Sequence, residues 1–130
     1  MHGLKTTPVI IVDDDSMMRE TLAAMLRTRG YRYIAFAHDG NQAAMLFEVP
    51  GYREALVLLD IHMPDIDGLT VLAAARRGGS RAYIVMASAD SAIDKVMAAL
   101  NGGADGFVVK PYTAQKIYGM LDRFETRMAA

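Results

Sequence analysis

A regular alternation of short apolar runs with longer, helix-like segments leaves few folds open to this chain. The runs begin about every 25 residues, and each has the length of an ordinary β-strand. They span Val9 to Val12, Tyr33 to Ala37, Leu56 to Leu59, Tyr83 to Ala87 and Gly106 to Val109. Four of them are continuous blocks rich in β-branched residues or Leu, which is typical of strands covered on both faces. The run at 33–37 is the weakest and suits a position nearer the edge of a sheet.

The segments between these runs carry apolar residues at the spacing of amphipathic helices. The three clearest stripes are Met18, Leu22, Met25 and Leu26; Ile93, Val96, Met97 and Leu100; and Ile117, Met120, Leu121, Phe124 and Met128. We interpret the Met residues in these stripes mainly as ordinary core packing, with partner binding by some exposed Met residues as the alternative. A strand followed by a helix, repeated along the chain, requires crossover connections between parallel strands. We therefore predict a doubly wound α/β domain, in which helices cover both faces of a parallel sheet.

Polar residues and glycines mark the ends of the predicted helices. Ser, Asp and Thr favour helix starts because their side chains accept hydrogen bonds from the free N–H groups of the first turn. Gly favours helix ends because it adopts left-handed backbone conformations without steric cost. The candidate starts are Ser16, Asp39, Asp67, Ser91 and Thr113, and the candidate ends are Gly30, Gly78 with Gly79, and Gly102 with Gly103.

Length and composition narrow the class of protein further. The 130 residues suit a single domain, with a core at about residues 8–126 that follows a loose N-terminal arm at residues 1–7. Hydrophobic residues make up 52% of the chain and charged residues 22%, which excludes a disordered chain. The absence of Cys excludes disulfides, thiolate metal sites and Cys nucleophiles. The net charge of -1 disfavours non-specific binding to nucleic acid. No apolar run approaches the roughly 18 residues of a membrane span and no secretion leader is recognisable, so we expect a cytoplasmic protein.

Chemically active side chains follow four of the predicted strands, at the point where each strand ends. These residues are Asp13, Asp14 and Asp15 after the first strand, Asp60 after the third, Ser88 after the fourth and Lys110 after the fifth. The carboxyl ends of parallel strands share one edge of the sheet, and ligands bind there, at the point where the strand order reverses. We therefore expect these side chains to converge on one crevice.

Such a cluster of acids needs a positive partner. Carboxylates within a few ångströms of one another repel, which raises their pKa values unless a cation compensates. Lys110 supplies one positive charge. A hard divalent cation suits carboxylate oxygens better, and Mg²⁺ fits a site with few protein ligands and several waters. The three histidines have no spacing typical of a shared metal, so zinc is not expected.

Four segments, taken in order, resemble the receiver domain of bacterial two-component response regulators, including its chemotaxis receivers. They are Val12-Asp-Asp-Asp-Ser-Met-Met-Arg19, Asp60-Ile-His-Met-Pro-Asp-Ile-Asp-Gly68, Ser88-Ala89 and Lys110-Pro111. The resemblance covers the chain from about Val9 to Phe124. It implies a flavodoxin-like (βα)5 fold of three layers, with a five-stranded parallel sheet in the order 2-1-3-4-5.

The resemblance assigns roles to the acids of the crevice. Asp60 corresponds to the phosphoacceptor, whose carboxylate attacks phosphorus and forms an aspartyl phosphate. Asp13 and Asp14 correspond to the acidic pair that binds Mg²⁺, together with Asp60 and the backbone carbonyl of His62. Because three acids stand in a row, we assign the pair to the two that directly follow the apolar run and leave Asp15 at the helix start.

Three further residues correspond to the part of the site that responds to phosphorylation. Lys110 would pair with Asp60 at rest and with the phosphoryl oxygens afterwards, and Ser88 would hydrogen-bond one of those oxygens. Ser88 and Phe107 match the two switch positions of the family, Phe107 being the aromatic one on the last strand. The resemblance also implies a cis peptide bond before Pro111.

The function implied by the resemblance is a switch operated by phosphorylation. The chain would be a signalling substrate with autophosphatase activity and not a conventional enzyme. A histidine kinase or a histidine phosphotransfer protein would donate the phosphoryl group, and the change would spread to the last strand and the last two helices. That surface would act on a downstream protein or a fused output domain, or would pair in a phosphorylation-dependent homodimer. Both a stand-alone receiver and part of a longer regulator fit the sequence.

Three other functions are weighed against this one. A Mg²⁺-dependent phosphohydrolase would also use Asp60 as its nucleophile, but such enzymes commonly have a second Asp two residues later, where this chain has His62. A phosphate-independent interaction module would need none of the site residues, all of which are present. A flavodoxin-like FMN binder would share the topology, but no Ser/Thr/Gly-rich phosphate loop follows Val12.

Overall fold

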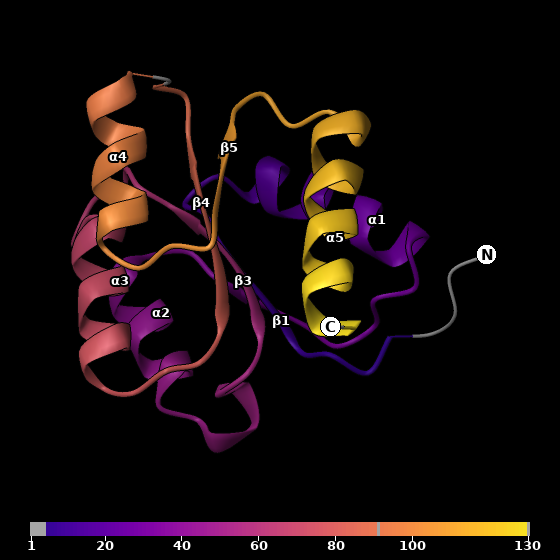
Figure 1. Ribbon diagram of the computed structural model, residues 1–130, viewed down its shortest axis with the longest axis horizontal. Helices are drawn as coiled ribbons and strands as arrows, with labels where there is room; N and C mark the ends of the chain where they lie inside the picture. The colour runs from indigo at the N-terminus through magenta and orange to yellow at the C-terminus, as the bar shows by residue number, and fades with distance from the viewer. Residues whose placement is uncertain (1–4, 91, 130) are drawn as a thin grey trace.

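Five parallel strands form the centre of the computed structural model, which describes residues 5–90 and 92–129 (Figure 1). The strands are β1 (Val9–Val12), β2 (Ile34–Ala37), β3 (Leu56–Asp60), β4 (Tyr83–Ser88) and β5 (Gly106–Val109). They pair in the order β2-β1-β3-β4-β5, as the resemblance implies. The strand order reverses between β1 and β3, so the crevice for a ligand lies at the carboxyl ends of these two strands.

Helices cover both faces of the sheet. α1 (Ser16–Thr28) and α5 (Ala114–Ala129) lie on one face, and α2 (Gly40–Phe47), α3 (Gly68–Arg77) and α4 (Ile93–Asn101) lie on the other (Figure 1). A short 3-10 helix, η1 (Pro50–Tyr52), connects α2 to β3. The predicted doubly wound sandwich of three layers is therefore confirmed. No helix in residues 5–90 and 92–129 is long and apolar enough to cross a membrane.

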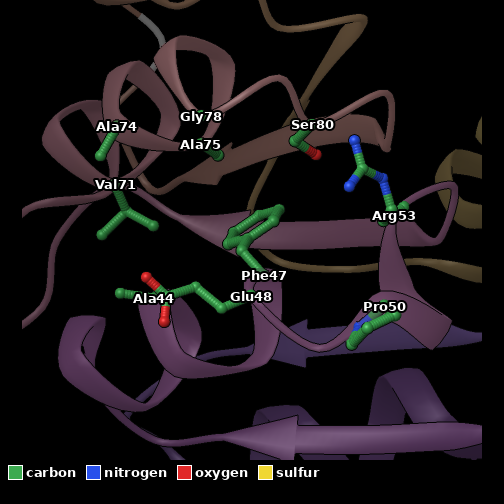
Figure 2. Close-up of a pocket in the computed structure, with 10 residues that line it drawn as sticks. All are labelled: Ala44, Phe47, Glu48, Pro50, Arg53, Val71, Ala74, Ala75, Gly78 and Ser80. Carbon is green, nitrogen blue, oxygen red and sulfur yellow. The ribbon is translucent and has the colours of Figure 1, made fainter.

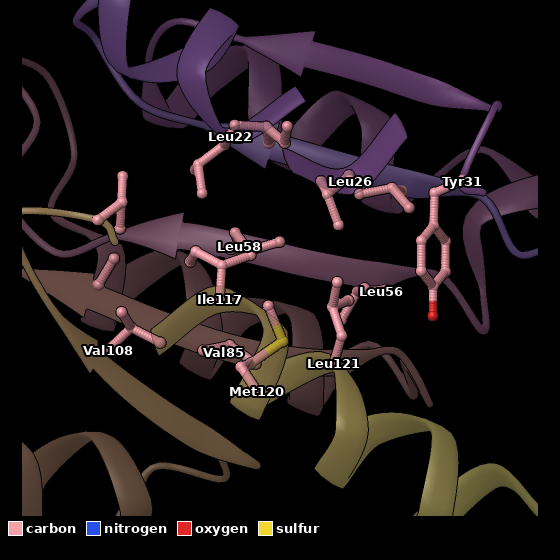
Figure 3. Close-up of a cluster of buried hydrophobic side chains, with 14 of the residues drawn as sticks. Leu22, Leu26, Tyr31, Leu56, Leu58, Val85, Val108, Ile117, Met120 and Leu121 are labelled. Atoms are coloured by element: carbon pink, nitrogen blue, oxygen red, sulfur yellow. The ribbon is translucent and has the colours of Figure 1, made fainter. Parts of the chain in front are cut away.

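The sheet separates two apolar clusters because successive residues of a strand point to opposite faces. In β1, Val9 and Ile11 pack toward α1 and α5, whereas Ile10 and Val12 pack toward the helices on the other face. Figure 3 shows the first cluster, in which side chains of α1 and α5 meet those of β3, β4 and β5. Burial on both faces explains why β1, β3 and β4 read as unbroken apolar runs in the sequence.

The helix starts follow the polar residues of the sequence closely. Three predicted caps accept a hydrogen bond from the backbone N–H three residues later: Asp39 at 2.8 Å, Asp67 at 2.9 Å and Thr113 at 3.2 Å. Asp15 caps α1, one residue before the predicted Ser16, which is the first residue of the helix. The predicted cap Ser91 lies outside the described residues.

Glycines end three of the helices, as predicted. Gly30, Gly79 and Gly103 have φ angles of 93°, 85° and 102°, in the left-handed region that a side chain disfavours. Each follows the last turn of a helix, where this conformation turns the chain away from the helix axis.

The apolar stripe of α4 is not part of the core. Ile93 is 78% exposed, Met97 48% and Leu100 45%, whereas Ala99 is the buried residue of this helix. The interpretation of Met97 as core packing is therefore wrong, and Met128 at the end of α5 is likewise exposed. Helical periodicity identifies an amphipathic helix but does not say what covers its apolar face.

Both edge strands are less buried than the three inner ones. β2 lies at one edge, which confirms the prediction for the weakest apolar run. β5 lies at the other edge, and Val108 is its one fully buried residue. Phe107 and Val108 of β5 pack on opposite faces of the sheet, so both faces of this strand are covered, but the burial is less complete than in the inner strands.

Lys5 is held against the end of α1, although it belongs to the stretch predicted as a loose arm. It forms an isolated parallel bridge with Tyr31, and its ammonium group lies 3.7 Å from the carboxylate of Glu125. Residues 1–4 of the predicted arm lie outside the described residues.

An ionic cluster joins the end of α1 to α5 near the amino ends of the strands. The buried guanidinium of Arg29 lies 2.7 Å from the carboxylate of Asp122 and 3.4 Å from that of Glu125. The hydroxyl of Tyr31 donates a hydrogen bond of 2.7 Å to Glu125, and burial together with this bond raises the pKa of Tyr31. This end of the sheet is therefore closed by charged groups that are paired with one another.

Candidate functional site

Three polar side chains are buried at the carboxyl edge of the sheet. Asp13 follows β1 and is 1% exposed, Asp60 ends β3 and is 3% exposed, and Ser88 ends β4 and is fully buried. Buried carboxylates are rare unless a partner compensates their charge. The fold therefore brings the predicted acids to the expected edge and removes two of them from solvent.

Lys110 provides the compensating charge. Its ammonium nitrogen lies 2.9 Å from Asp13 Oδ2 and 3.0 Å from Asp60 Oδ2, so one cation bridges two carboxylates. The backbone N–H of Lys110 donates a hydrogen bond of 2.9 Å to the carbonyl of Ser88, which fixes the end of β5 beside β4. The peptide bond between Lys110 and Pro111 is cis, as the resemblance implies.

The remaining carboxylate oxygens of this pair are held by the backbone. Asp13 Oδ1 accepts a hydrogen bond of 2.9 Å from the N–H of Asp15, and Asp60 Oδ1 accepts one of 3.2 Å from the N–H of His62. The carboxylate of Asp15 is occupied as the cap of α1, where it accepts from the N–H groups of Met17 and Met18. Asp15 is thus engaged elsewhere, which supports the choice of the preceding two acids as the pair.

Asp14 completes an acidic cluster at the solvent side. Each of Asp13, Asp14 and Asp60 offers a carboxylate oxygen, and these atoms lie within 4.8 Å of one another. Asp14 is exposed, whereas the other two are buried. The cluster is therefore open to a ligand from the side of Asp14.

The charges of the site are only partly balanced. Burial and the negative charge of Asp13 raise the pKa of Asp60, and they outweigh the opposing effect of Lys110. Burial lowers the pKa of Lys110, but its interactions with the carboxylates of Asp13 and Asp60 outweigh burial, so that its pKa is raised overall. The site thus holds more negative charge than one ammonium group neutralises.

These residues fit a hard divalent cation. The donor set consists of carboxylate oxygens without thiols or imidazoles, which suits Mg²⁺. Asp13 Oδ2 is buried and has an ion pair with Lys110 but no hydrogen bond from the described residues, so it retains capacity to bind a cation. The raised pKa of Asp60 also favours cation binding, because a nearby cation would stabilise the ionised carboxylate and lower this pKa.

The other predicted residues lie around this cluster. Ser88 Oγ accepts a hydrogen bond of 2.9 Å from the N–H of Asp90, which orients its hydroxyl group at the end of β4. Phe107 lies on β5, is partly buried, and packs on the α2, α3 and α4 side of the sheet. The side chain of His62 is exposed. Phe107 therefore lies within β5, three residues before Lys110, and is not part of the acidic cluster.

Two residues near the cluster are absent from the sequence-based prediction. The ring of Tyr112 lies 5.8 Å from the ammonium nitrogen of Lys110, and burial, followed by the charges of Asp13 and Asp60, raises the pKa of Tyr112. Arg19 donates a hydrogen bond of 2.7 Å to the backbone carbonyl of Asp13. Both residues stand within a few positions of a predicted site residue in the sequence, but this proximity alone does not indicate that their side chains point toward the cluster.

Gly68 packs directly against the backbone of the predicted phosphoacceptor. Its N–H donates a hydrogen bond of 2.7 Å to the carbonyl of Ile61, and a Cβ atom at this position would overlap the backbone oxygen of Asp60. Only Gly allows the start of α3 to approach β3 this closely, which explains the Gly at the end of the 60–68 motif.

A cavity of about 330 Å³ lies between α2 and α3, away from the acidic cluster (Figure 2). The ring of Phe47 lies across its middle, with Val71 and Ala74 of α3 on one side and Arg53 and Pro50 on the other. None of the predicted site residues lines this cavity, so the predicted chemistry does not depend on it.

Comparison with known proteins identifies the family of this chain. The family model of the response regulator receiver domain matches residues 9–122. The chemotaxis protein CheY of Bacillus subtilis (strain 168) is 34% identical over 118 residues, which cover 88% of this chain and 94% of that protein. The transcriptional regulatory protein PrrA of Mycobacterium tuberculosis is 35% identical over 115 residues, which cover 88% of this chain but 48% of PrrA. This chain thus spans about half the length of PrrA.

Solved structures agree with these relatives. The CheX–CheY–BeF3–Mg complex of Borrelia burgdorferi matches with a TM-score of 0.84 and 30% identity, over 91% of this chain and 88% of that one. A two-component response regulator of Clostridium difficile matches with a TM-score of 0.85 and 25% identity, over 96% of this chain and all of that one. The match of fold, of ordered motifs and of a family model across most of the sequence shows that this chain belongs to the response regulator receiver domain family.

Proposed function

We propose that the carboxylate of Asp60 accepts a phosphoryl group from a histidine kinase or a histidine phosphotransfer protein, and that phosphorylation switches the surface of the domain. One observation carries the proposal: Asp60 is buried beside Asp13 and is bridged to it by Lys110, in a chain that belongs to the receiver family. A buried carboxylate with a single ammonium partner is poised to react with an incoming electrophile and is protected from bulk water.

Asp13, Asp14 and Asp60 would hold Mg²⁺, with the backbone carbonyl of His62 as a further ligand. When bound, the ion would neutralise negative charge on the oxygens of the incoming phosphoryl group. The oxygen donor set and the raised pKa of Asp60 support this assignment. The related CheY of Borrelia burgdorferi was solved with BeF3 and Mg, which also supports it.

The transfer itself requires a nucleophile and well-placed positive charge. An oxygen of Asp60 would form the new bond to phosphorus while the bond from phosphorus to the donor nitrogen breaks, and the electron pair of that bond would leave with the donor imidazole. Lys110 already lies within ion-pair distance of Asp60, so its ammonium group would follow the charge onto the phosphoryl oxygens. The hydroxyl of Ser88 would donate a hydrogen bond to one of those oxygens. Attack of water on phosphorus would later break the bond from phosphorus to the Asp60 oxygen, release inorganic phosphate and restore the carboxylate. This is the autophosphatase activity expected of the chain.

The response to phosphorylation would pass along β4 and β5. Ser88, at the end of β4, accepts a backbone hydrogen bond from Lys110, which directly follows β5. A shift of Ser88 and Lys110 toward the phosphoryl group would therefore move the ends of both strands. Phe107, within β5, would change its side-chain packing, and this change would alter the exposed apolar face of α4 and the adjoining surface of α5. Ile93 and Met97 of α4 would then contact a downstream protein, a fused output domain, or a second copy of the chain in a homodimer.

Membership of the receiver family supports a cytoplasmic location and a role as a signalling phosphoprotein. It gives no support to the phosphohydrolase alternative, in which an Asp would be expected where His62 stands. We accordingly expect no turnover of small phosphomonoesters by this chain.

Intact-mass measurement after incubation with acetyl phosphate and Mg²⁺ tests the proposal. The wild-type chain should gain the mass of one phosphoryl group, and D60N should gain none, because an amide oxygen is a poor nucleophile. D94N, which changes an exposed carboxylate on α4, is the matched control and should be modified like the wild type. An unmodified wild-type chain, or a D60N variant that is still modified, would reject the mechanism.

A further inference from the structure

The side chain of Asp65 attaches the loop between β3 and α3 to the start of α2. The carboxylate of Asp65 accepts hydrogen bonds of 2.9 Å from the N–H groups of both Gly40 and Asn41, which are 25 and 24 residues away in the sequence. These N–H groups belong to the first turn of α2, where no helical carbonyl is available to them. The local cap, Asp39, accepts from Gln42 instead. Asp65 thus provides a second cap of α2 from a distant loop.

The contact is close enough to fix the position of the loop. A Cβ atom at Gly40 would lie 2.9 Å from both the Cβ and the carbonyl oxygen of Ile66, so the start of α2 is pressed against the residue that follows Asp65. At the other end of the same loop, the N–H of Gly68 donates to the carbonyl of Ile61 at 2.7 Å. The loop from Ile61 to Gly68 is therefore held both to α2 and to itself.

This loop carries the groups that matter for the metal site. It starts directly after Asp60, and its second residue is His62, whose N–H donates to Asp60 Oδ1. Both ends of the loop lie beside Asp60, and its middle part contacts α2 through Asp65 and Ile66. The position of the backbone near the cluster therefore depends on how this middle part is held. An unattached loop would lose conformational freedom on binding a cation, and that loss would weaken binding.

We propose that Asp65 is a positioning residue for the metal site: by capping α2 from the β3–α3 loop, it holds the backbone around His62 in the arrangement that binds Mg²⁺. The inference rests on the proposed function, because it assumes that the acidic cluster binds Mg²⁺. It adds a residue that does not touch the cluster, and it makes α2 a support of the site. Outer groups that orient metal ligands commonly change metal affinity by about 10- to 100-fold when removed.

Titration of the full chain with Mg²⁺, followed by the backbone amide NMR signals of the loops after β1 and β3, tests the inference. We expect D65A to raise the Kd for Mg²⁺ by about tenfold, as loss of an orienting group does. D39A is the matched control, since it also removes a carboxylate that caps α2 but leaves the loop attached. Its Kd should stay within about twofold of the wild type, because it orients no metal ligand.

A third variant separates loss of positioning from loss of fold. D65N keeps one oxygen acceptor for α2, so its Kd should lie between those of the wild type and D65A, with the wild-type pattern of amide signals elsewhere. If D65A or D65N binds Mg²⁺ like the wild type, or if D39A weakens binding as much as D65A, the inference is overturned and the proposed function stands. A wild-type chain that binds no Mg²⁺ would overturn both.

Discussion

Gly68 illustrates how tightly single residues are packed around the predicted phosphoacceptor. Because Gly68 has no side chain, the first turn of α3 can pack on the backbone of Asp60. The N–H of Gly68 donates a hydrogen bond to the carbonyl of Ile61, the residue that follows Asp60. Because the neighbouring atoms belong to the backbone, they cannot swing aside as the end of a long side chain could. Gly68, which has no side chain, thus helps to fix the backbone that carries the carboxylate of Asp60.

G68A should therefore disturb both stability and chemistry. The added methyl group overlaps the backbone of Asp60 and forces a shift, which we expect to lower the free energy of unfolding by about 1–3 kcal/mol. The rate of phosphorylation by acetyl phosphate should fall as well. G51A is the control, because a Cβ atom there would meet nothing within 4 Å, and it should stay within about 0.5 kcal/mol of the wild type in urea unfolding. Equal stability of the two variants would contradict this account of Gly68.

The residues of the site differ in how far the sequence could reveal them. Asp13, Asp60 and Lys110 stand directly at the ends of apolar runs, and the convergence of parallel strands is enough to predict that they meet. Tyr112 stands two residues after Lys110, but the direction of its ring toward that ammonium group depends on how the folded chain packs. The partners of Asp65 are 24 and 25 residues away in the sequence. No local pattern encodes such contacts, because they depend on how the finished elements are packed.

At the scale of helices and strands, equal periodicity led to unequal burial. α4 and α5 both carry clear apolar stripes, but α5 buries Ile117, Met120, Leu121 and Phe124, whereas α4 buries Ala99. α5 lies beside α1 over the sheet and contributes to the cluster in Figure 3. The stripe predicts a helix correctly in both cases, but the arrangement of the layers decides which stripe becomes core.

The cap on α2 makes a prediction about acid stability. Hydrogen bonds from backbone N–H groups, that of Gly40 first, hold the pKa of Asp65 below its ordinary value of 3.8. A carboxyl group with a lower pKa in the folded state than in the unfolded state stabilises the fold above its ordinary pKa. This stabilisation disappears as the pH falls through the folded-state pKa.

Urea unfolding of the wild type and D65A across a range of pH tests this expectation. The wild type should be more stable than D65A at neutral pH, and the difference should shrink as the pH falls below 3.8. At a pH low enough to protonate Asp65 in the folded chain, the ionic part of the difference should be gone. A difference that grows toward acid pH would mean that the hydrogen bonds to α2 do not favour the ionised form.

The molecule as a whole has two chemically different ends. Charges near the amino ends of the strands are paired, as in the cluster of Arg29, Asp122 and Glu125. At the carboxyl ends, the ammonium group of Lys110 forms ion pairs with Asp13 and Asp60, and the exposed carboxylate of Asp14 adds a further negative charge to the cluster. A cation should therefore stabilise the folded state by binding at the carboxyl ends of the strands.

Magnesium should raise the free energy of unfolding, and the gain should grow with the logarithm of the ratio of its concentration to its Kd. At tenfold above the Kd, the gain for a ligand that binds only the folded state is about 1.4 kcal/mol, and a chelator should reverse it. D14N removes one of the three clustered carboxylates at an exposed position, so its gain from Mg²⁺ should be clearly smaller. If the wild type and D14N gained equally in urea unfolding, Mg²⁺ would be acting outside this cluster.

The exposed helix α4 has a consequence for how such a chain can diversify. Because Ile93, Met97 and Leu100 take little part in holding the fold together, their identities are not dictated by packing against the interior. Substitutions there can change which surface the helix complements while leaving the sheet, the acids and the loop after β3 intact. Under the proposed function, in which α4 contacts the downstream partner, the same phosphorylation site could in this way serve different partners, each matched by a few side chains of this helix.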